Sequence, residues 1–187
     1  MSPSTLTALS PLDGRYENKV APLRPLMSEY GLLYFRCLVE IRWLITLSDE
    51  KKIKEAPRLT KSQREFLESI IKNFDEASAK EIKSIEAATA HDVKAVEYFI
   101  REKIHSQADL ATLLPMVHFA ATSEDINNLS YALMLKATRE TVLLPNMDAL
   151  IEKLKQMAND YANIAMLART HGQAASPTTL GKELMNV

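Results

Sequence analysis

Glycine and cysteine are both scarce in this chain. Its 187 residues contain four glycines and a single cysteine, Cys37. One cysteine cannot form an intrachain disulfide framework and offers no thiolate metal cluster. So few glycines disfavour glycine-rich phosphate-binding loops and turn-rich β folds. Because Cys37 lies within an apolar stripe of helical spacing, we expect it to be a core residue.

An excess of charge of one sign is also missing. The chain has 23 Lys and Arg residues against 24 Asp and Glu residues, so its formal net charge is −1. This balance gives no field that would attract a polyanion, and we expect no nucleic-acid partner. The four histidines show no i, i+4 pairing and have no cysteine neighbours. A zinc or iron site is therefore not expected, and no cofactor is expected either.

Long hydrophobic runs are absent as well. Apolar residues make up 47% of the chain, but charged residues interrupt them throughout, which is typical of a soluble folded protein. No segment is long and apolar enough to span a membrane, so no membrane partner is expected. The first residues, 1–4, lack the basic patch and apolar run of a signal peptide. We therefore expect a cytoplasmic protein.

The apolar periodicity predicts an all-α chain. Residues 1–25 contain four prolines and an Asp-Gly pair, and we expect them to form a turn-rich arm. From Leu26 to Ile45 the apolar residues follow i, i+3, i+4 spacing, which predicts a helix. Pro145 should bend or restart a helix, and only residues 164–168 could be extended. Capping patterns predict further helix starts at Thr60, Ser78, Thr89 and Thr122.

The end of the chain predicts one more helix. Ser176 is a suitable N-cap and Pro177 a suitable first helical residue, so we expect a helix that runs into Val187. That helix would end without a cap, and we therefore expect the chain to be the N-terminal part of a longer protein. His171 lies between a threonine and a glycine, which places it in a turn close to this helix start, where backbone N–H groups can hold an anion.

Three polar clusters, residues 89–92, 122–125 and 170–176, precede expected helices. The simplest interpretation of each is helix capping, which stabilises a helix by about 0.5–2 kcal/mol. Histidine adds chemical capacity to two of them. Two other histidines have structural interpretations: His105, near a helix end, is either solvated or complements the helix dipole, and His118 is a core-edge residue with a hydrogen-bond partner. A serine hydrolase is poorly supported because the chain has no Gly-x-Ser-x-Gly elbow.

Four sequence motifs occur in a characteristic order. They are Ser10-Pro11-Leu12-Asp13-Gly14-Arg15-Tyr16, His91-Asp92-Val93-Lys94-Ala95-Val96-Glu97-Tyr98, Thr122-Ser123-Glu124-Asp125-Ile126-Asn127-Asn128 and Arg169-Thr170-His171-Gly172-Gln173. With them the chain resembles the adenylosuccinate lyase family of bacterial purine synthesis, within the fumarase/aspartase superfamily, over essentially its whole length. The resemblance implies an all-α fold, with an N-terminal helical domain over residues 1–111 and the beginning of a central helix-bundle domain over 112–187. It also implies a homotetramer with active sites between subunits.

The resemblance implies a β-elimination and a nucleotide substrate. Adenylosuccinate would give AMP and fumarate, and the succinylaminoimidazole carboxamide ribotide would give its carboxamide and fumarate. His171 matches the general acid of the family. Arg15 and Tyr16 match residues that contact the substrate phosphate. The remaining matches to substrate-binding positions are Ala90, His91, Asp92, Thr122, Ser123 and Gln173.

Of these residues, Thr122 and Ser123 match a hydroxyl pair that holds the succinyl or fumarate carboxylate. Asp92 and Asp125 could instead act chiefly as helix caps. Two positions depart from the pattern of the family: Ala90 stands where relatives commonly have asparagine, and Ala174 stands where they tend to have proline. The first departure removes a side-chain contact if the amide binds substrate, and the second loosens the turn without removing a reacting group.

The catalytic base of the resembled family is a serine on a loop far downstream of residue 187. The chain is therefore expected to hold the acid without the base, and to be inactive alone. Two alternatives stay open. The longer protein could be a related fumarate-forming lyase that acts on argininosuccinate or aspartate. Alternatively, the chain could be a non-catalytic helical interaction module.

Overall fold

The computed structural model describes residues 4–187. The first three residues of the predicted turn-rich arm, 1–3, lie outside the described residues. The chain divides into two compact units, Met1–Thr138 and Arg139–Val187. Both are mainly helical, and one two-stranded sheet lies in the second unit, so the all-α prediction is confirmed for the described part of the chain. The domain boundary at residues 111 and 112 stays a prediction.

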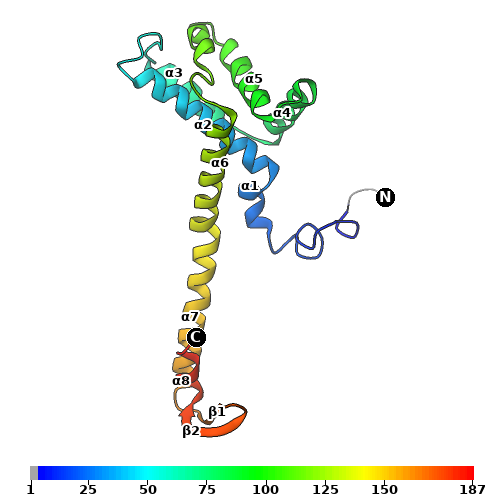
Figure 1. Cartoon of the computed structure of the whole chain (residues 1–187), viewed down its shortest axis with the longest axis vertical. Helices are drawn as coiled ribbons and strands as arrows, with labels where there is room; N and C mark the ends of the chain where they lie inside the picture. Colours follow the sequence, from blue (N-terminus) through cyan, green and yellow to red (C-terminus); the bar gives the residue numbers. More distant parts are fainter. Residues whose placement is uncertain (1–3) are drawn as a thin grey trace. The chain divides into compact units, whose positions relative to one another are not determined.

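The first unit contains eight short or long helices after the N-terminal turns. Residues 4–20 form turns, as predicted for the arm. The helices, coloured from blue to green in Figure 1, are η1 (Ala21–Leu23), α1 (Arg24–Met27), α2 (Glu29–Asp49), α3 (Lys61–Lys72), α4 (Glu76–Thr89), α5 (Asp92–His105), η2 (Ala108–Met116) and α6 (Ser123–Thr138).

Helix α2 is the central element of this unit, because it packs against α3, α4, α5 and α6. Its 21 residues include twelve that are buried. The predicted core position of Cys37 is confirmed, since its side chain is fully buried, and burial raises the pKa of its thiol. Helices α4 and α5 lie side by side and supply Ile82, Phe99 and Ile100 to the same core (Figure 1).

The predicted helix over residues 26–45 is interrupted, which corrects the sequence interpretation. Ser28 has extended backbone with ψ 175°, so α1 ends at Met27 and a new helix begins at Glu29. The Ser28 hydroxyl caps α2 by accepting from the N–H of Gly31. The two helices approach so closely that a Cβ on Gly31 would lie 2.6 Å from the Leu26 carbonyl oxygen. A regular apolar stripe does not show such a break.

Helix starts were predicted with mixed success. The capping box at Thr60 is confirmed, with reciprocal bonds between Thr60 and Gln63. The predicted start at Ser78 is wrong, because α4 begins at Glu76. Asp75 is its N-cap, and its carboxylate accepts from the N–H and the hydroxyl of Ser78. The stronger cap, three residues earlier, makes Ser78 the third residue of the helix.

The second unit consists of η3 (Arg139–Leu143, a π-helical turn), α7 (Leu144–Asp160), β1 (Ala165–Thr170), β2 (Gln173–Thr179) and α8 (Leu180–Leu184). Pro145 lies in the first turn of α7, so the predicted restart of the helix is confirmed. Gly181 of α8 lies against α7, where a Cβ would be 2.2 Å from the carbonyl oxygen of Ala158. Only a residue without a side chain fits this contact.

The helix predicted from Pro177 is wrong. Ser176 and Pro177 belong to β2, which pairs antiparallel with β1. Each strand of a two-stranded sheet is an edge, and an edge strand tolerates proline. The helix in this region is α8, which begins at Leu180 with Thr179 as its N-cap and ends at Leu184 before Val187. The residues predicted as possibly extended, 164–168, fall largely within β1.

None of the helices in residues 4–187 combines the length and the apolar character required to cross a bilayer.

Candidate active-site segments

The segment around His91 connects α4 to α5 through a tight turn. Ala90 closes α4 in the left-handed conformation, with φ 53°. Asparagine and glycine adopt this left-handed backbone more readily than alanine. The conformation of Ala90 is therefore one reason why an asparagine would suit this position. His91 is the N-cap of α5, as its Nδ1 atom accepts from the N–H of Lys94 at 3.2 Å. A helix does start in this cluster, but the start predicted at Thr89 is wrong, because Thr89 is the last residue of α4 and His91 is the N-cap of α5.

The hydrogen bond of His91 fixes what its ring can offer to a ligand. Because Nδ1 is the acceptor, the neutral imidazole carries its proton on Nε2. The side chain is half exposed. His91 therefore presents an N–H donor at a helix N-terminus, and both features favour an oxygen anion.

Asp92 has a structural role that is visible in its contacts. Its Oδ1 atom accepts from the N–H of Val93 at 2.8 Å, and its Oδ2 atom pairs with Nη2 of Arg36 at 2.5 Å. Burial raises the pKa of the Asp92 carboxyl, but the Val93 N–H and the Arg36 charge outweigh it, and the net shift is downward. Asp92 therefore has a structural role in the first turn of α5, beside the N-cap His91.

Thr122 and Ser123 lie at the start of α6. The backbone N–H and the hydroxyl of Thr122 both donate to Oδ2 of Asp125, at 2.8 and 2.9 Å. These two bonds lower the pKa of the Asp125 carboxyl. Asp125 therefore caps the helix start, as the alternative interpretation held. The Thr122 hydroxyl must turn away from Asp125 before it can donate to any other acceptor.

Buried Arg36 joins two of these segments, and sequence reasoning missed it. Its side chain on α2 is 3% exposed. Besides Asp92, it binds α6 through Nε, which donates to Oδ1 of Asn127 at 3.0 Å. The segments of His91 and Thr122 are therefore held by one guanidinium. The signal in the sequence was a pair of charged residues, Arg36 and Glu40, at i, i+4 spacing within an apolar stripe.

Glu40 and His118 hold the loop that leads to Thr122. Oε1 of Glu40 lies 2.6 Å from Nδ1 of His118, so the predicted hydrogen-bond partner of this core-edge histidine is confirmed. His118 has a left-handed backbone with φ 62°. One turn along α2, Nε1–H of Trp43 donates to the Phe119 carbonyl oxygen at 2.7 Å. Helix α2 thus fixes this loop with two side chains.

The Glu40→Gln variant is expected to be more stable than the wild type at neutral pH. Burial raises the pKa of the Glu40 carboxyl, the bond and charge of His118 oppose this shift, and the net direction is upward. Oε2 of Glu40 has no hydrogen-bond partner among residues 4–187. A carboxyl with a higher pKa in the folded chain binds its proton more tightly there, so stability falls as pH rises above the unfolded value of about 4.3.

We expect Glu40→Gln and the wild type to have the same free energy of unfolding near pH 4. At pH 7 the free energy of unfolding of the variant should be higher by about 1 kcal/mol. Urea denaturation followed by Trp43 fluorescence measures it, since Trp43 is the single tryptophan. Glu65→Gln, at an exposed position, is the control and should change the unfolding free energy little. A gain for Glu40→Gln that shrinks as pH rises would contradict the expectation.

Arg15 and Tyr16 lie in the N-terminal turns and are exposed. The N–H of Tyr16 donates to the Pro11 carbonyl oxygen at 2.9 Å, which orders the turn. Among residues 4–138, no hydrogen bond or ion pair links their side chains to His91, Asp92, Thr122 or Ser123. The two residues therefore remain exposed donors suited to phosphate oxygens, and their place in a site stays a prediction.

His171 and Gln173 belong to the second unit. His171 and Gly172 form the two-residue connection between β1 and β2, where Thr170 pairs with Gln173. Both turn residues have positive φ, 50° and 74°, which is the type I′ geometry of tight hairpins. The predicted turn position of His171 is confirmed. Its imidazole lies exposed at the tip of a hairpin, and not beside the helix start that was expected at Pro177.

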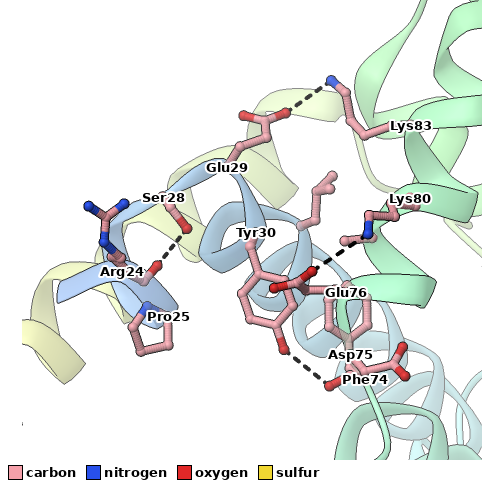
Figure 2. Close-up of a pocket in the computed structure, with 12 residues that line it drawn as sticks. Arg24, Pro25, Ser28, Glu29, Tyr30, Phe74, Asp75, Glu76, Lys80 and Lys83 are labelled. Atoms are coloured by element: carbon pink, nitrogen blue, oxygen red, sulfur yellow. Dashed lines mark hydrogen bonds and ion pairs between the residues drawn. The ribbon is translucent and has the colours of Figure 1, made fainter. Parts of the chain in front are cut away.

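A separate surface cavity of about 600 Å³ lies between the starts of α2 and α4 (Figure 2). None of the predicted site residues lines it. Four of its charged side chains are paired with one another, since Lys83 binds Glu29 at 3.1 Å and Lys80 binds Glu76 at 3.6 Å. In Figure 2 the Tyr30 hydroxyl also donates to the Phe74 carbonyl oxygen, at 3.1 Å. These contacts describe a structural crevice between helices.

Several curated proteins that resemble this chain are adenylosuccinate lyases. A family model described as lyase matches residues 14–187. Adenylosuccinate lyase of Haemophilus influenzae is 54% identical over 187 residues, which is all of this chain and 41% of that protein. The adenylosuccinate lyases of Vibrio cholerae and Escherichia coli are each 51% identical over the same shares. The chain thus spans 41% of the length of these curated relatives.

A solved structure gives an independent comparison of the fold. The 3-carboxy-cis,cis-muconate lactonizing enzyme of Pseudomonas putida matches with a TM-score of 0.63 and 20% sequence identity. The match covers 89% of this chain and 36% of that one. At this identity the likeness shows a shared fold alone.

Proposed function

Since the chain belongs to the lyase family matched over residues 14–187, we propose that it is part of an adenylosuccinate lyase. The observation that carries the proposal is the 54% identity to the Haemophilus influenzae enzyme over a match that spans all 187 residues of this chain. The substrates are adenylosuccinate and the succinylaminoimidazole carboxamide ribotide. The reaction takes place in the cytoplasm.

The proposed reaction is a β-elimination. A base removes a proton from the succinyl carbon, the C–N bond breaks, and its electron pair passes to the leaving nitrogen. His171 is the acid that protonates this nitrogen, and the products are fumarate and AMP. The exposed imidazole at a tight hairpin supports this role, because the turn holds the ring outside the packed core.

The other predicted residues bind the substrate. Arg15 and Tyr16 take the phosphate, and the segment of Ala90, His91 and Asp92 contributes the Nε2–H donor of His91. Thr122 and Ser123, at a helix start, hold the carboxylate whose negative charge grows in the transition state. Gln173 lies two residues after His171, at the start of β2, and also lines the substrate site. Asp92 acts mainly through its contacts with Val93 and Arg36.

The whole enzyme is proposed to be a homotetramer in which long helices bundle together. Residues 1–111 form its N-terminal helical domain, and residues 112–187 begin the central bundle. Exposed apolar side chains support this assembly, because large apolar patches on a protein surface mark interaction sites. On α6 and on α7, those more than half exposed are Leu129, Leu135, Met147 and Leu150.

The same exposed faces also suit the second candidate, a non-catalytic helical module that binds partner helices. Activity separates the two candidates. We expect the 187-residue chain alone to release no fumarate, because the serine base is proposed to lie outside it. The chimera, in which these 187 residues replace the matching 41% of the Haemophilus influenzae enzyme, should release fumarate from adenylosuccinate.

The measurement is the ultraviolet absorbance change on adenylosuccinate, with argininosuccinate as the control substrate. Activity of the chimera on argininosuccinate alone would point to a sibling lyase. A folded but inactive chimera would favour the helical module. Steady fumarate release by the 187-residue chain would show that the base lies within it.

A further inference from the structure

Helix α2 carries two buried charged side chains and a hydrogen-bonding indole along one face. Arg36, Glu40 and Trp43 follow i, i+4, i+7 spacing, so they lie on one face of the helix. Arg36 and Glu40 are 3% and 2% exposed. Burial of charged side chains is costly, and such residues are normally paired with partners that fix them. Here the partners lie in the segments that carry His91 and Thr122.

The contacts of Arg36 are divided between two helix starts. Nη2 pairs with Oδ2 of Asp92, in the first turn of α5, at 2.5 Å. Nε donates to Oδ1 of Asn127, one turn beyond Ser123 in α6, at 3.0 Å. Asn127 in turn donates from Nδ2 to Oε1 of Glu124 at 3.0 Å. One rigid guanidinium therefore sets the spacing between α5 and α6 at their N-terminal ends.

The planar shape of the guanidinium is essential to this arrangement. Its N–H groups point in fixed directions, so two acceptors on different helices can be held at once. A lysine carries the same charge as a single compact group and cannot reproduce the fork. Electrostatic attraction alone would keep Asp92 near α2, but it would not fix Asn127.

We propose that Arg36 is a positioning residue of the substrate-binding surface, which ties the His91 segment to the Thr122 and Ser123 segment. This inference rests on the proposed function. Arg36 is almost completely buried and acts through its two partners. The donor of His91 and the hydroxyls at the start of α6 must keep a fixed separation to hold different groups of one substrate. Arg36 supplies that separation.

Hydrogen exchange tests the structural half of the proposal on the 187-residue chain itself. In Arg36→Lys, the amides of Lys94 and Ile126, at the starts of α5 and α6, should exchange at least about tenfold faster. The amide of Gln63 at the start of α3 is the internal reference and should not change. Unchanged exchange at Lys94 and Ile126 would overturn the proposal, and so would an equal increase at Gln63, which would mean general loosening.

Steady-state kinetics of the chimera test the functional half. We expect Arg36→Lys to lower kcat/KM for adenylosuccinate by about 10- to 100-fold, because small displacements of binding groups have effects of this size. KM should rise, because the His91 segment binds substrate, and kcat should fall as well, because Thr122 and Ser123 hold the charge that grows in the transition state. Arg42→Lys, on the same helix in an exposed ion pair with Glu68, is the matched control and should leave KM unchanged.

The outcomes separate the possible failures. A lower melting temperature for Arg36→Lys with unchanged KM and kcat would make Arg36 purely structural and overturn the proposal. A loss confined to kcat would also overturn it, because positioning of binding groups predicts a rise in KM. An inactive but folded chimera with Arg36 intact would reject the proposed function and the substrate-binding role of Arg36 with it. The exchange result on the 187-residue chain would still decide whether Arg36 ties the two helix starts.

Discussion

His171→Ala is expected to lower the kcat of the chimera on adenylosuccinate by about 100- to 10,000-fold, the usual contribution of a positioned acid or base. The imidazole is exposed at the tip of the β1–β2 hairpin, so its loss removes no core packing. The leaving nitrogen would then depart without a proton donor. The ultraviolet absorbance change measures the effect, with the unmodified chimera assayed in parallel.

The turn itself requires a second variant. His171 has φ 50°, a left-handed backbone that alanine adopts at a cost of about 1–2 kcal/mol. Asparagine tolerates this backbone better and has no titratable group to transfer a proton, so His171→Asn should preserve the turn and still lose activity. His105→Ala, at the exposed last residue of α5, should retain full activity. Wild-type kcat in His171→Asn would show that His171 serves the turn and not the chemistry.

Features governed by neighbouring residues were predictable from the sequence. The capping box at Thr60, the restart of a helix at Pro145 and the turn at His171 all depend on residues within a few positions. The capping pattern also located the helix start at Thr122, and it placed the start of α5 two residues too early, at Thr89 instead of His91. Local hydrogen bonds decide these features, and such bonds leave a signature in the sequence.

The hairpin shows where local signals fail. Ser176 followed by Pro177 favours a helix start on its own, but the backbone of this stretch pairs with residues 165–170. The pairing depends on the tight turn at His171 and Gly172, where two residues with positive φ match the twist of the strands. Gly172 is a residue type that favours such a turn, so this half of the turn was predictable. The left-handed backbone of His171 was not predictable from its residue type.

The candidate site was predictable in its parts but not in its connections. Arg36 lies 56 residues from Asp92 and 91 residues from Asn127 in the sequence, and Glu40 lies 78 residues from His118. No periodicity links positions so far apart, so the partners appear only in the folded chain. What the sequence did contain was the anomaly of charged residues within a buried stripe, and such an anomaly is worth testing as a site feature.

Phe99→Ala is expected to lower the unfolding free energy of the first unit by about 3–5 kcal/mol, the usual effect of removing a buried aromatic side chain. Phe99 is 1% exposed. Its ring meets Phe74 edge to face, with centroids 6.3 Å apart, and Nζ of Lys103 lies 4.8 Å from its centroid. These contacts join α5 to Phe74, in the segment between α3 and α4, so the truncation removes packing between two parts of the core as well as the buried ring itself.

Urea denaturation followed by Trp43 fluorescence measures this loss, because Trp43 lies in the first unit and its indole N–H is bound to the Phe119 carbonyl oxygen. Phe99→Leu should lose less than half as much, since it keeps most of the buried volume. Tyr98→Ala, at the adjacent exposed position, should lose less than about 1 kcal/mol. Equal losses for Phe99→Ala and Tyr98→Ala would mean that α5 does not depend on the core face on which Phe99 lies. In that case the start of α5, with His91 and Asp92, would be held mainly by Arg36 rather than by the packing behind it.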